Sequence, residues 1–286
     1  MGILAAILLG ISFVLQQGAA QDVPAADFLR LRLVADLVRK PRWLAGIATM
    51  IVGQLLAAWM EGHIVLALSA PLLATNLLVA LGLAWPLSGQ ALAVSEVIGA
   101  LVLLTGVIAL SVAQAASPSY GVVGTPRYWP YCGVAVAAIV AGLAVAGWRR
   151  SGDARAVLVG AGAGLVFGTQ DALTRLVVQT ADTHGVAALL TTWPVYTLVA
   201  VGATGLWLMQ NAFSVAPLHV SLPPMTAMEP VCALLLGAIV FREKMPTSPG
   251  MITLQIAGLI ALLTGVVLVA RAPALTSLHR PSGHRQ

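Results

Sequence analysis

The chain has 286 residues, of which 59% are apolar and only 9% are charged, and its formal net charge is +5. Soluble domains carry about 25% charged residues, so this composition excludes a water-soluble surface. The basic residues lie between long apolar blocks, where they set membrane orientation. We therefore expect a lipid bilayer, and not nucleic acid, as the partner of this surface.

Nine apolar blocks of about 20 residues follow one another, and each is long enough to cross a bilayer as a helix. No alternating strand pattern is present, so we expect an all-α polytopic membrane protein with about nine transmembrane helices. No Lys or Arg precedes the first block, which favours a retained helix over a signal peptide. The predicted spans are residues 2–20, 43–60, 64–84, 92–113, 129–148, 156–179, 188–210, 217–241 and 250–270.

The loop after the first span, residues 21–42, is basic and amphipathic. Leucines such as Leu33 and Leu37 interleave there with Arg30 and Arg32. This pattern predicts a helix on the anionic inner leaflet, with a plain solvated loop as the alternative for residues 22–40. At the other end of the chain, residues 271–286 contain Pro, Ser, His and Arg, which predicts a disordered cytoplasmic tail.

The chain also contains an internal repeat, because residues of the first half recur in the same order 154 to 159 positions later. The repeat predicts a first half-repeat of four spans (1–113), a linking span (114–150) and a second half-repeat of four spans (151–270). The second copy starts five crossings after the first, so it is inverted, as in many transporters. Matched positions include Gly10/Gly164, Phe13/Phe167, Gln16/Gln170, Gln54/Gln210, His63/His219, Pro71/Pro230 and Gly99/Gly258.

The distribution of Lys and Arg predicts the orientation. Eleven lie in the loops after odd-numbered spans or in the tail, three lie in the loops after even-numbered spans, and Arg175 lies within a span. Basic loops stay in the cytoplasm. We therefore expect the N-terminus outside and the C-terminus in the cytoplasm, in a plasma membrane that is the inner membrane of a bacterium.

Charged residues within the spans are the first candidates for a site. Asp171 and Arg175 are four residues apart and continue the face of a glycine stripe formed by Gly160, Gly164 and Gly168. The stripe predicts close helix packing, and an intramembrane charge normally faces protein or water. The pair is either a substrate- or proton-linked site or a structural pair near the outer interface.

Two further candidates lie in the seventh and eighth predicted spans. Glu229 stands halfway along the eighth span, where a carboxylate suits either proton coupling or a kinked helix. Pro223, Pro224 and Pro230 predict that this span is broken or kinked. Tyr196 lies in the seventh span and is a candidate for lining a cavity.

Uncharged amides complete the candidate set, since they either join helices by hydrogen bonds or bind a substrate. His219 lies near a span end and is expected to serve as an interface or cap residue. Glu96 lies near a span boundary, where we expect it to be solvated. The candidate amides are Gln16, Gln17, Gln54, Asn76, Gln170 and Gln210.

Two runs of residues carry a resemblance to a known family. Met228 to Val231 through Phe241 to Lys244, followed by Gly258 to Val269, resembles the end of a half-repeat in the EamA-type drug/metabolite transporter superfamily. Ala70 to Leu72 and Gly99 to Leu110 repeat it in the first half. The resemblance implies two half-bundles and secondary transport.

Other features are similar to a branch of that superfamily, the NIPA-like magnesium transporters. They are the nine-span layout with the N-terminus outside, Trp43, and the run from Leu15 to Gly18. That branch is expected to carry Glu where Gln54 stands. Magnesium prefers carboxylate oxygens, and the core of the predicted bundle offers at most Asp171 and Glu229.

The leading hypothesis is a secondary transporter that moves a small organic solute, metabolite or drug by alternating access. The alternative is a NIPA-like transporter of magnesium or another divalent cation, and a hypothesis of another class is a non-transporting membrane scaffold. The chain has no phosphate-binding loop or catalytic constellation, so we expect no enzyme, no cofactor and no resident metal. The expected partners are a small-molecule or ion substrate and the bilayer, and a homodimer is left open.

Overall fold

The computed structural model describes residues 2–23, 28–61, 73–88, 93–115, 126–242 and 248–278. Within these ranges the regular structure is entirely helical. The helices are α1 (Gly2–Gln21), α2 (Leu31–Leu37), α3 (Pro41–Glu61), α5 (Asn76–Ser88), α6 (Val94–Ala115), α7 (Trp129–Trp148), α8 (Gly152–His184), α9 (Trp193–Val215), α10 (Leu218–Val240) and α11 (Pro249–Leu278), with the 3-10 turns η2 (Pro126–Tyr128) and η3 (Val186–Leu190).

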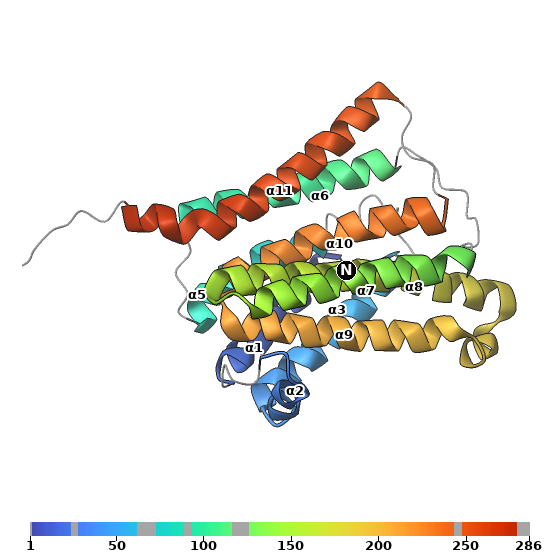
Figure 1. Ribbon diagram of the computed structural model, residues 1–286, viewed down its shortest axis with the longest axis horizontal. Helices are drawn as coiled ribbons and strands as arrows, with labels where there is room; N and C mark the ends of the chain where they lie inside the picture. The colour runs from blue at the N-terminus through green and yellow to red at the C-terminus, as the bar shows by residue number, and fades with distance from the viewer. Residues whose placement is uncertain are drawn as a thin grey trace, which may run out of the picture.

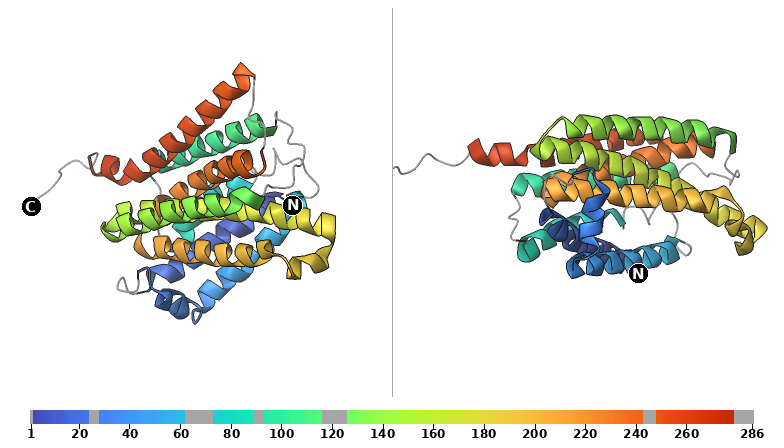
Figure 2. Two further views of the ribbon diagram at one scale, coloured as in Figure 1. Left: turned by 45° about the vertical axis from the view of Figure 1, so that its right-hand side comes forward. Right: turned by 60° about the horizontal axis from the view of Figure 1, so that its bottom comes forward.

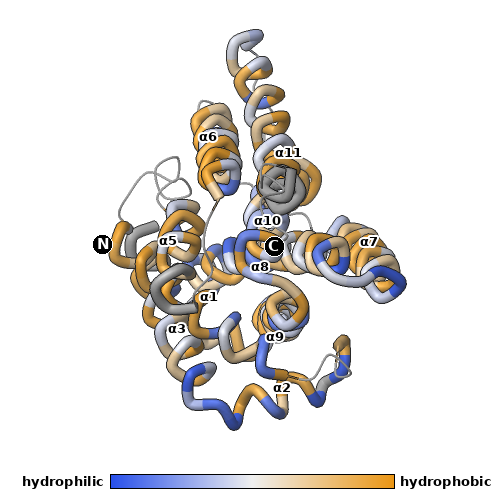
Figure 3. Tube along the Cα trace, turned by 90° about the vertical axis from the view of Figure 1, so that its left-hand side faces the viewer, coloured by the Kyte–Doolittle hydropathy of each residue, from blue (hydrophilic) through white to orange (hydrophobic). Residues whose placement is uncertain are grey.

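Seven of the described helices, α1 and α6 to α11, are long and apolar enough to cross a membrane. The fold is therefore that of a multi-pass, all-helical membrane protein. α3 covers the predicted span 43–60, whereas the predicted span 64–84 lies partly outside the described residues. Figure 3 shows hydrophobic residues along α6 and α7, which stand at the periphery where lipid would contact them.

Several helix bounds differ from the predictions. The predicted span 188–210 begins as a helix only at Trp193, because Pro194 occupies the first turn, where its missing N–H costs nothing. α10 is one continuous helix that contains all three prolines, so of the two predicted alternatives, a broken or a kinked span, the break is absent. α11 continues to Leu278, into the segment expected to be a disordered tail, and residues 279–286 lie outside the described residues.

The glycine stripe brings α8 against α10, as predicted. A Cβ added at Gly160 would lie 2.7 Å from the carbonyl oxygen of Ser221, and one at Gly164 would meet the backbone of Met225. The contact points advance together along both helices, so α8 and α10 run parallel. Backbones can approach this closely in a membrane only where side chains are absent, which explains the spacing of the stripe.

α6 and α11 form an antiparallel pair held by glycines. A Cβ at Gly99 would lie 3.0 Å from the carbonyl oxygen of Gly265, and one at Gly106 would lie 2.7 Å from that of Gly258. Figure 1 shows this pair side by side and set apart from the layers formed by α10, α8 and α9, and the left view in Figure 2 agrees. The two helices that end the predicted half-repeats therefore pack on each other.

The first two long helices of each predicted half also share one contact. In the first half the side chain of Gln16 on α1 lies across Gly46 of α3, 2.8 Å from where a Cβ would stand. In the second half the side chain of Gln170 on α8 lies across Gly202 of α9, at 3.1 Å from the corresponding position.

Helix ends that border the basic loops gather at one end of the bundle, called here the basic end. Lys40 donates to the carbonyl of Ala19 at 3.0 Å, which joins the approach to α3 to the end of α1. The Arg155 guanidinium lies 4.5 Å from the centre of the Phe28 ring, and its Nε donates to the carbonyl of Gly147 at 3.3 Å. The ends of α1 and α7 and the start of α8 therefore lie on the same side.

Candidate functional site

Four buried amide side chains join the two predicted halves at the basic end. Gln210 Nε2 on α9 donates to Gln16 Oε1 on α1 at 2.5 Å. Gln17 Nε2 donates to the carbonyl of Ala216 at 3.5 Å, and the N–H of Leu29 donates to Asn211 Oδ1 at 2.5 Å. All four are fully buried. We call Gln16, Gln17, Gln210 and Asn211 the amide cluster.

Among the described residues, the contact that the repeat relates to the amide cluster is not formed. Its counterpart would join Gln54 on α3 to Gln170 on α8. Gln54 is instead exposed, and Gln170 is half-buried against Gly202. Among the described residues α1 packs on α9, whereas α3 and α8 form no comparable interface. The two halves therefore contact each other asymmetrically.

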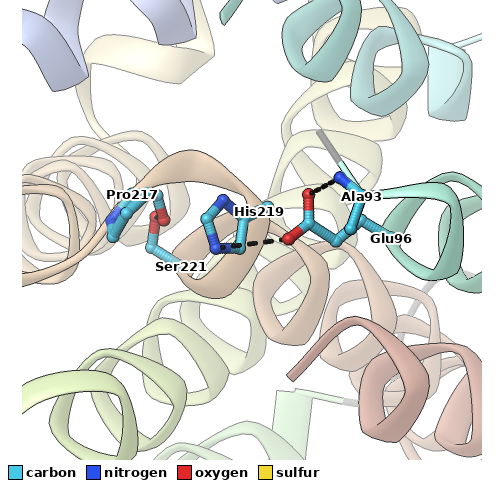
Figure 4. Close-up of polar contacts among 5 residues, drawn as sticks. All are labelled: Ala93, Glu96, Pro217, His219 and Ser221. Carbon is cyan, nitrogen blue, oxygen red and sulfur yellow. Dashed lines mark hydrogen bonds and ion pairs between the residues drawn. The ribbon is translucent and has the colours of Figure 1, made fainter. Parts of the chain in front are cut away.

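A second polar contact joins the halves at the same end, between α6 and α10 (Figure 4). His219 Nε2 lies 3.7 Å from Glu96 Oε1, and the two side chains are 14% and 5% exposed. Glu96 Oε2 also accepts the N–H of Ala93 at 3.0 Å, which caps the start of α6. The prediction that Glu96 is solvated is wrong, because α10 packs over the first turn of α6.

The charged candidates lie on α10 and on the half of α8 that is farther from the basic end. Asp171 is exposed and Glu229 is half-buried, and the two lie close enough for their charges to interact. The Arg175 guanidinium lies 4.9 Å from the centre of the Phe241 ring, a cation–π distance. The structure therefore brings these charges to one side of the α8–α10 pair, away from the amide cluster.

The other two candidates have individual environments. Asn76 is half-buried at the start of α5, and its Oδ1 is buried with no hydrogen-bond partner among the described residues. Tyr196 is 61% exposed, and its hydroxyl donates to the carbonyl of Leu190 at 2.6 Å. That bond ties the first turns of α9 to η3.

An open groove of about 1050 Å³ lies between α7 and α9, with α8 as its floor. We call it the apolar groove. The indole rings of Trp129 and Trp193 meet edge-on at 5.9 Å where α7 and α9 begin. None of the ten candidate residues lines the groove. Its walls include Val134, Ala137, Val140, Ala141, Val166, Leu173, Ala200, Val201, Trp207 and Leu208.

No charged side chain lines the apolar groove, and its hydroxyls are already bonded. The hydroxyls of Thr169, Thr197 and Thr204 each donate to a carbonyl one turn earlier, at 2.8, 3.1 and 2.8 Å. The indole nitrogens of Trp129 and Trp207, which both line the groove, are buried without a partner among the described residues. The groove is therefore an apolar space with two unpaired hydrogen-bond donors in its walls.

Sequence reasoning missed two polar residues that join the halves. Asn211 was overlooked because its counterpart in the repeat is Leu55, so symmetry did not mark it. Glu96 was placed at a helix boundary and expected to face water. Its position three residues after Ala93 fits a capping glutamate, but only the packing of α10 shows that it is buried.

Comparisons with known proteins give a relative but no family. The chain is 26% identical over 231 residues to an uncharacterized protein of Corynebacterium glutamicum, a match that covers 81% of this chain and 80% of that protein. No family model matches the chain, and no solved structure does. Within the described residues, no group of three or more His, Cys, Asp or Glu could hold a metal ion.

Proposed function

We propose that this protein is a secondary transporter of small organic solutes, built from two inverted half-bundles of four spans each that rock about a shared interface. The chain is in the state that is closed at the basic end. That end faces the cytoplasm of a bacterial cell, with the N-terminus outside, as the charge distribution favours. The single observation that carries the proposal is the asymmetry of contacts between repeat-related residues.

Contacts that recur in both halves support the inverted repeat. Adding 159 to Gly99 and Gly106 gives Gly258 and Gly265, so the two glycine contacts between α6 and α11 exchange under the repeat. Two antiparallel helices whose contacts interchange in this way are related by a local twofold axis perpendicular to them. Gln16 on Gly46 and Gln170 on Gly202 are likewise counterparts, offset by 154 and 156 residues.

The asymmetry supports alternating access. Two equivalent halves can form either of two equivalent interfaces, α1 with α9 or α3 with α8, and the chain has formed the first. The repeat-related state would bring Gln170 to Gln54 and separate Gln16 from Gln210. Inverted-repeat transporters expose a central site to each side in turn by such an exchange.

The apolar groove supports an organic solute. A ligand bound there would be mostly hydrophobic, because the wall offers no charge, and it would carry a hydrogen-bond acceptor for the indole of Trp207 or Trp129. The groove opens along α7, a helix that packs mainly on α8 and is mostly exposed. An amphiphile could therefore reach the groove from the lipid phase.

Cross-linking in membranes tests the exchange of interfaces. Two double variants, Gln16→Cys with Gln210→Cys and Gln54→Cys with Gln170→Cys, are made without the native cysteines and treated with a short bis-methanethiosulfonate, which links thiols through reducible disulfides. A transporter cross-links both pairs. Each cross-link blocks uptake of a fluorescent lipophilic cation into proteoliposomes, and reduction restores it. A matched control, Gln170→Cys with Gly202→Cys, lies within one half and should cross-link without blocking uptake.

A scaffold gives a different result. It cross-links only the pair at the basic end, because it has no second state, and uptake equals that of empty liposomes. That outcome would end the transport proposal and leave the fold description intact.

Divalent-cation transport is the second candidate, favoured by the closeness of Asp171 to Glu229. Carboxylate oxygens are the ligands that magnesium prefers. Liposomes that contain a magnesium-sensitive dye separate the candidates. Magnesium entry that Asp171→Asn abolishes would favour this alternative, whereas uptake of amphiphiles without magnesium entry favours the organic solute.

A further inference from the structure

We infer that His219 and Glu96 form a proton-binding site that couples protonation to closure of the basic end. The inference rests on the proposed alternating access and adds the coupling ion to it. With a proton bound, an imidazolium faces a carboxylate across the junction of α6 and α10. Without it, the same contact sets a neutral ring against a buried anion.

The geometry suits a group that binds and releases one proton. His219 Nε2 lies 3.7 Å from Glu96 Oε1, and Nδ1 is buried with no partner among the described residues. Glu96 is held by the Ala93 N–H at 3.0 Å, so its carboxylate stays in place whichever form the ring takes. Histidine is the side chain whose charge ordinarily changes between about pH 5 and 8.

Most of the elements that pack around the pair bring no charged group to it. α1, α5 and α9 carry no charged residue, and on α10 itself Glu229 is almost three turns away. From α8, Arg155 is directed to the carbonyls of Gly147 and Arg150, and Asp153 is exposed. On α11, position 271 is an arginine that the antiparallel register places near the start of α6.

The location makes the pair a contact between the halves. Glu96 belongs to the first half and His219 to the second, at the same end as the amide cluster. Opening the basic end must separate them. A protonated pair resists separation because the attraction between the imidazolium and the carboxylate is lost when the two move apart. Loss of the proton from the imidazolium to water removes the attraction and leaves a neutral ring.

The repeat shows why protonation would favour one state over the other. The counterpart of His219 is His63, but the counterpart of Glu96, 159 residues later, is Gln255. The repeat-related junction therefore lacks the carboxylate. A proton on the histidine stabilises closure at the basic end more than closure at the opposite end. A ligand that binds two states unequally shifts their populations, which is the requirement for coupling.

Spin-label distances across the basic end test the inference without any substrate. Labels at Leu44→Cys on α3 and Ala154→Cys on α8 report separation of the halves, because both positions are exposed. We expect mainly the short distance at about pH 5.5 and a closed-to-open ratio at least about tenfold lower at about pH 8, as loss of a charged contact allows.

Variants of the pair separate a proton site from a structural contact. His219→Gln should be largely open, and His219→Lys largely closed, at every pH. Glu96→Gln should remove the pH dependence. The control His184→Gln changes an exposed histidine at the far end of α8, and should keep the wild-type profile.

Two results would overturn the inference, and they have different consequences for the proposal of alternating access. If the distance follows pH in the wild type and still does so in the His219 and Glu96 variants, the proton binds elsewhere and alternating access survives. If the wild type keeps one distance at every pH, the site is not coupled. If, in addition, cysteines at positions 54 and 170 do not cross-link, alternating access itself is refuted.

Discussion

Substitution of one glycine in the α8 stripe should destabilise the bundle while a neighbouring glycine on the same helix tolerates it. The change is Gly164→Ala, with Gly162→Ala as the matched control. A Cβ at position 164 would meet the carbonyl group of Met225 and lie 3.0 Å from its Cα. A Cβ at position 162 would lie 3.8 Å from Val140 and 4.0 Å from Leu143, which is ordinary contact.

The expected difference follows from which atoms must move. At position 164 the neighbour is backbone, so relief requires that α8 and α10 separate along their whole contact. Overpacking of this kind costs about 1–3 kcal/mol, and we expect about 2 kcal/mol for Gly164→Ala. For Gly162→Ala we expect a change of less than about 1 kcal/mol, and in the stabilising direction, because alanine favours the helix.

Reversible unfolding of the purified protein in mixed detergent micelles, followed by tryptophan fluorescence, measures both variants. Wild-type helix content in each folded variant is the control for misassembly. Equal stability of the two variants would refute the close α8–α10 contact, and so would a greater loss in Gly162→Ala.

Three further predictions concern the interface, the groove and the charges. Gln210→Leu should weaken closure at the basic end and raise cross-linking between cysteines at positions 54 and 170 several-fold, since a buried hydrogen bond contributes roughly 1 kcal/mol. If cross-linking does not rise, the hydrogen bond between Gln210 and Gln16 does not stabilise the closed state. Trp207→Phe should lower the affinity for an amphiphile with a carbonyl acceptor about threefold to tenfold, and leave the affinity for its hydrocarbon analogue unchanged. Both affinities are measured by fluorescence quenching, and equal effects on the two ligands would remove the indole from the site. Asp171→Asn should lower liposome flux more than folded yield by size-exclusion chromatography; normal flux would remove Asp171 from the site.

Much of the local structure follows from the sequence, because lipid limits the choices. Backbone groups in hydrocarbon must bond internally, so long apolar blocks become helices, and α1, α6, α7, α10 and α11 begin within a few residues of their predicted starts. Glycines spaced four apart leave a stripe without side chains, and this alone predicted the close packing of α8. Proline at the start of α9 moved that boundary, which hydropathy does not record.

The repeat in the sequence marks Gln16 and Gln210 as candidates, but it does not predict that they bond to each other. Symmetry relates Gln16 to Gln170 and Gln210 to Gln54, so a sequence treats both cross-pairs alike. Only the packing of α1 on α9 chose one pair and left Gln54 exposed. The choice depends on how the two predicted halves pack against each other, which brings together helices that are distant in the sequence.

Apolar length, glycine spacing and charge distribution were enough to make this a multi-pass helical protein with a predicted orientation, because each acts within one helix or one loop. The burial of Glu96 against His219 and the groove between α7 and α9 needed the tertiary structure. Both arise where helices distant in the sequence meet, and the free energy of such a contact depends on neighbours that no local pattern specifies.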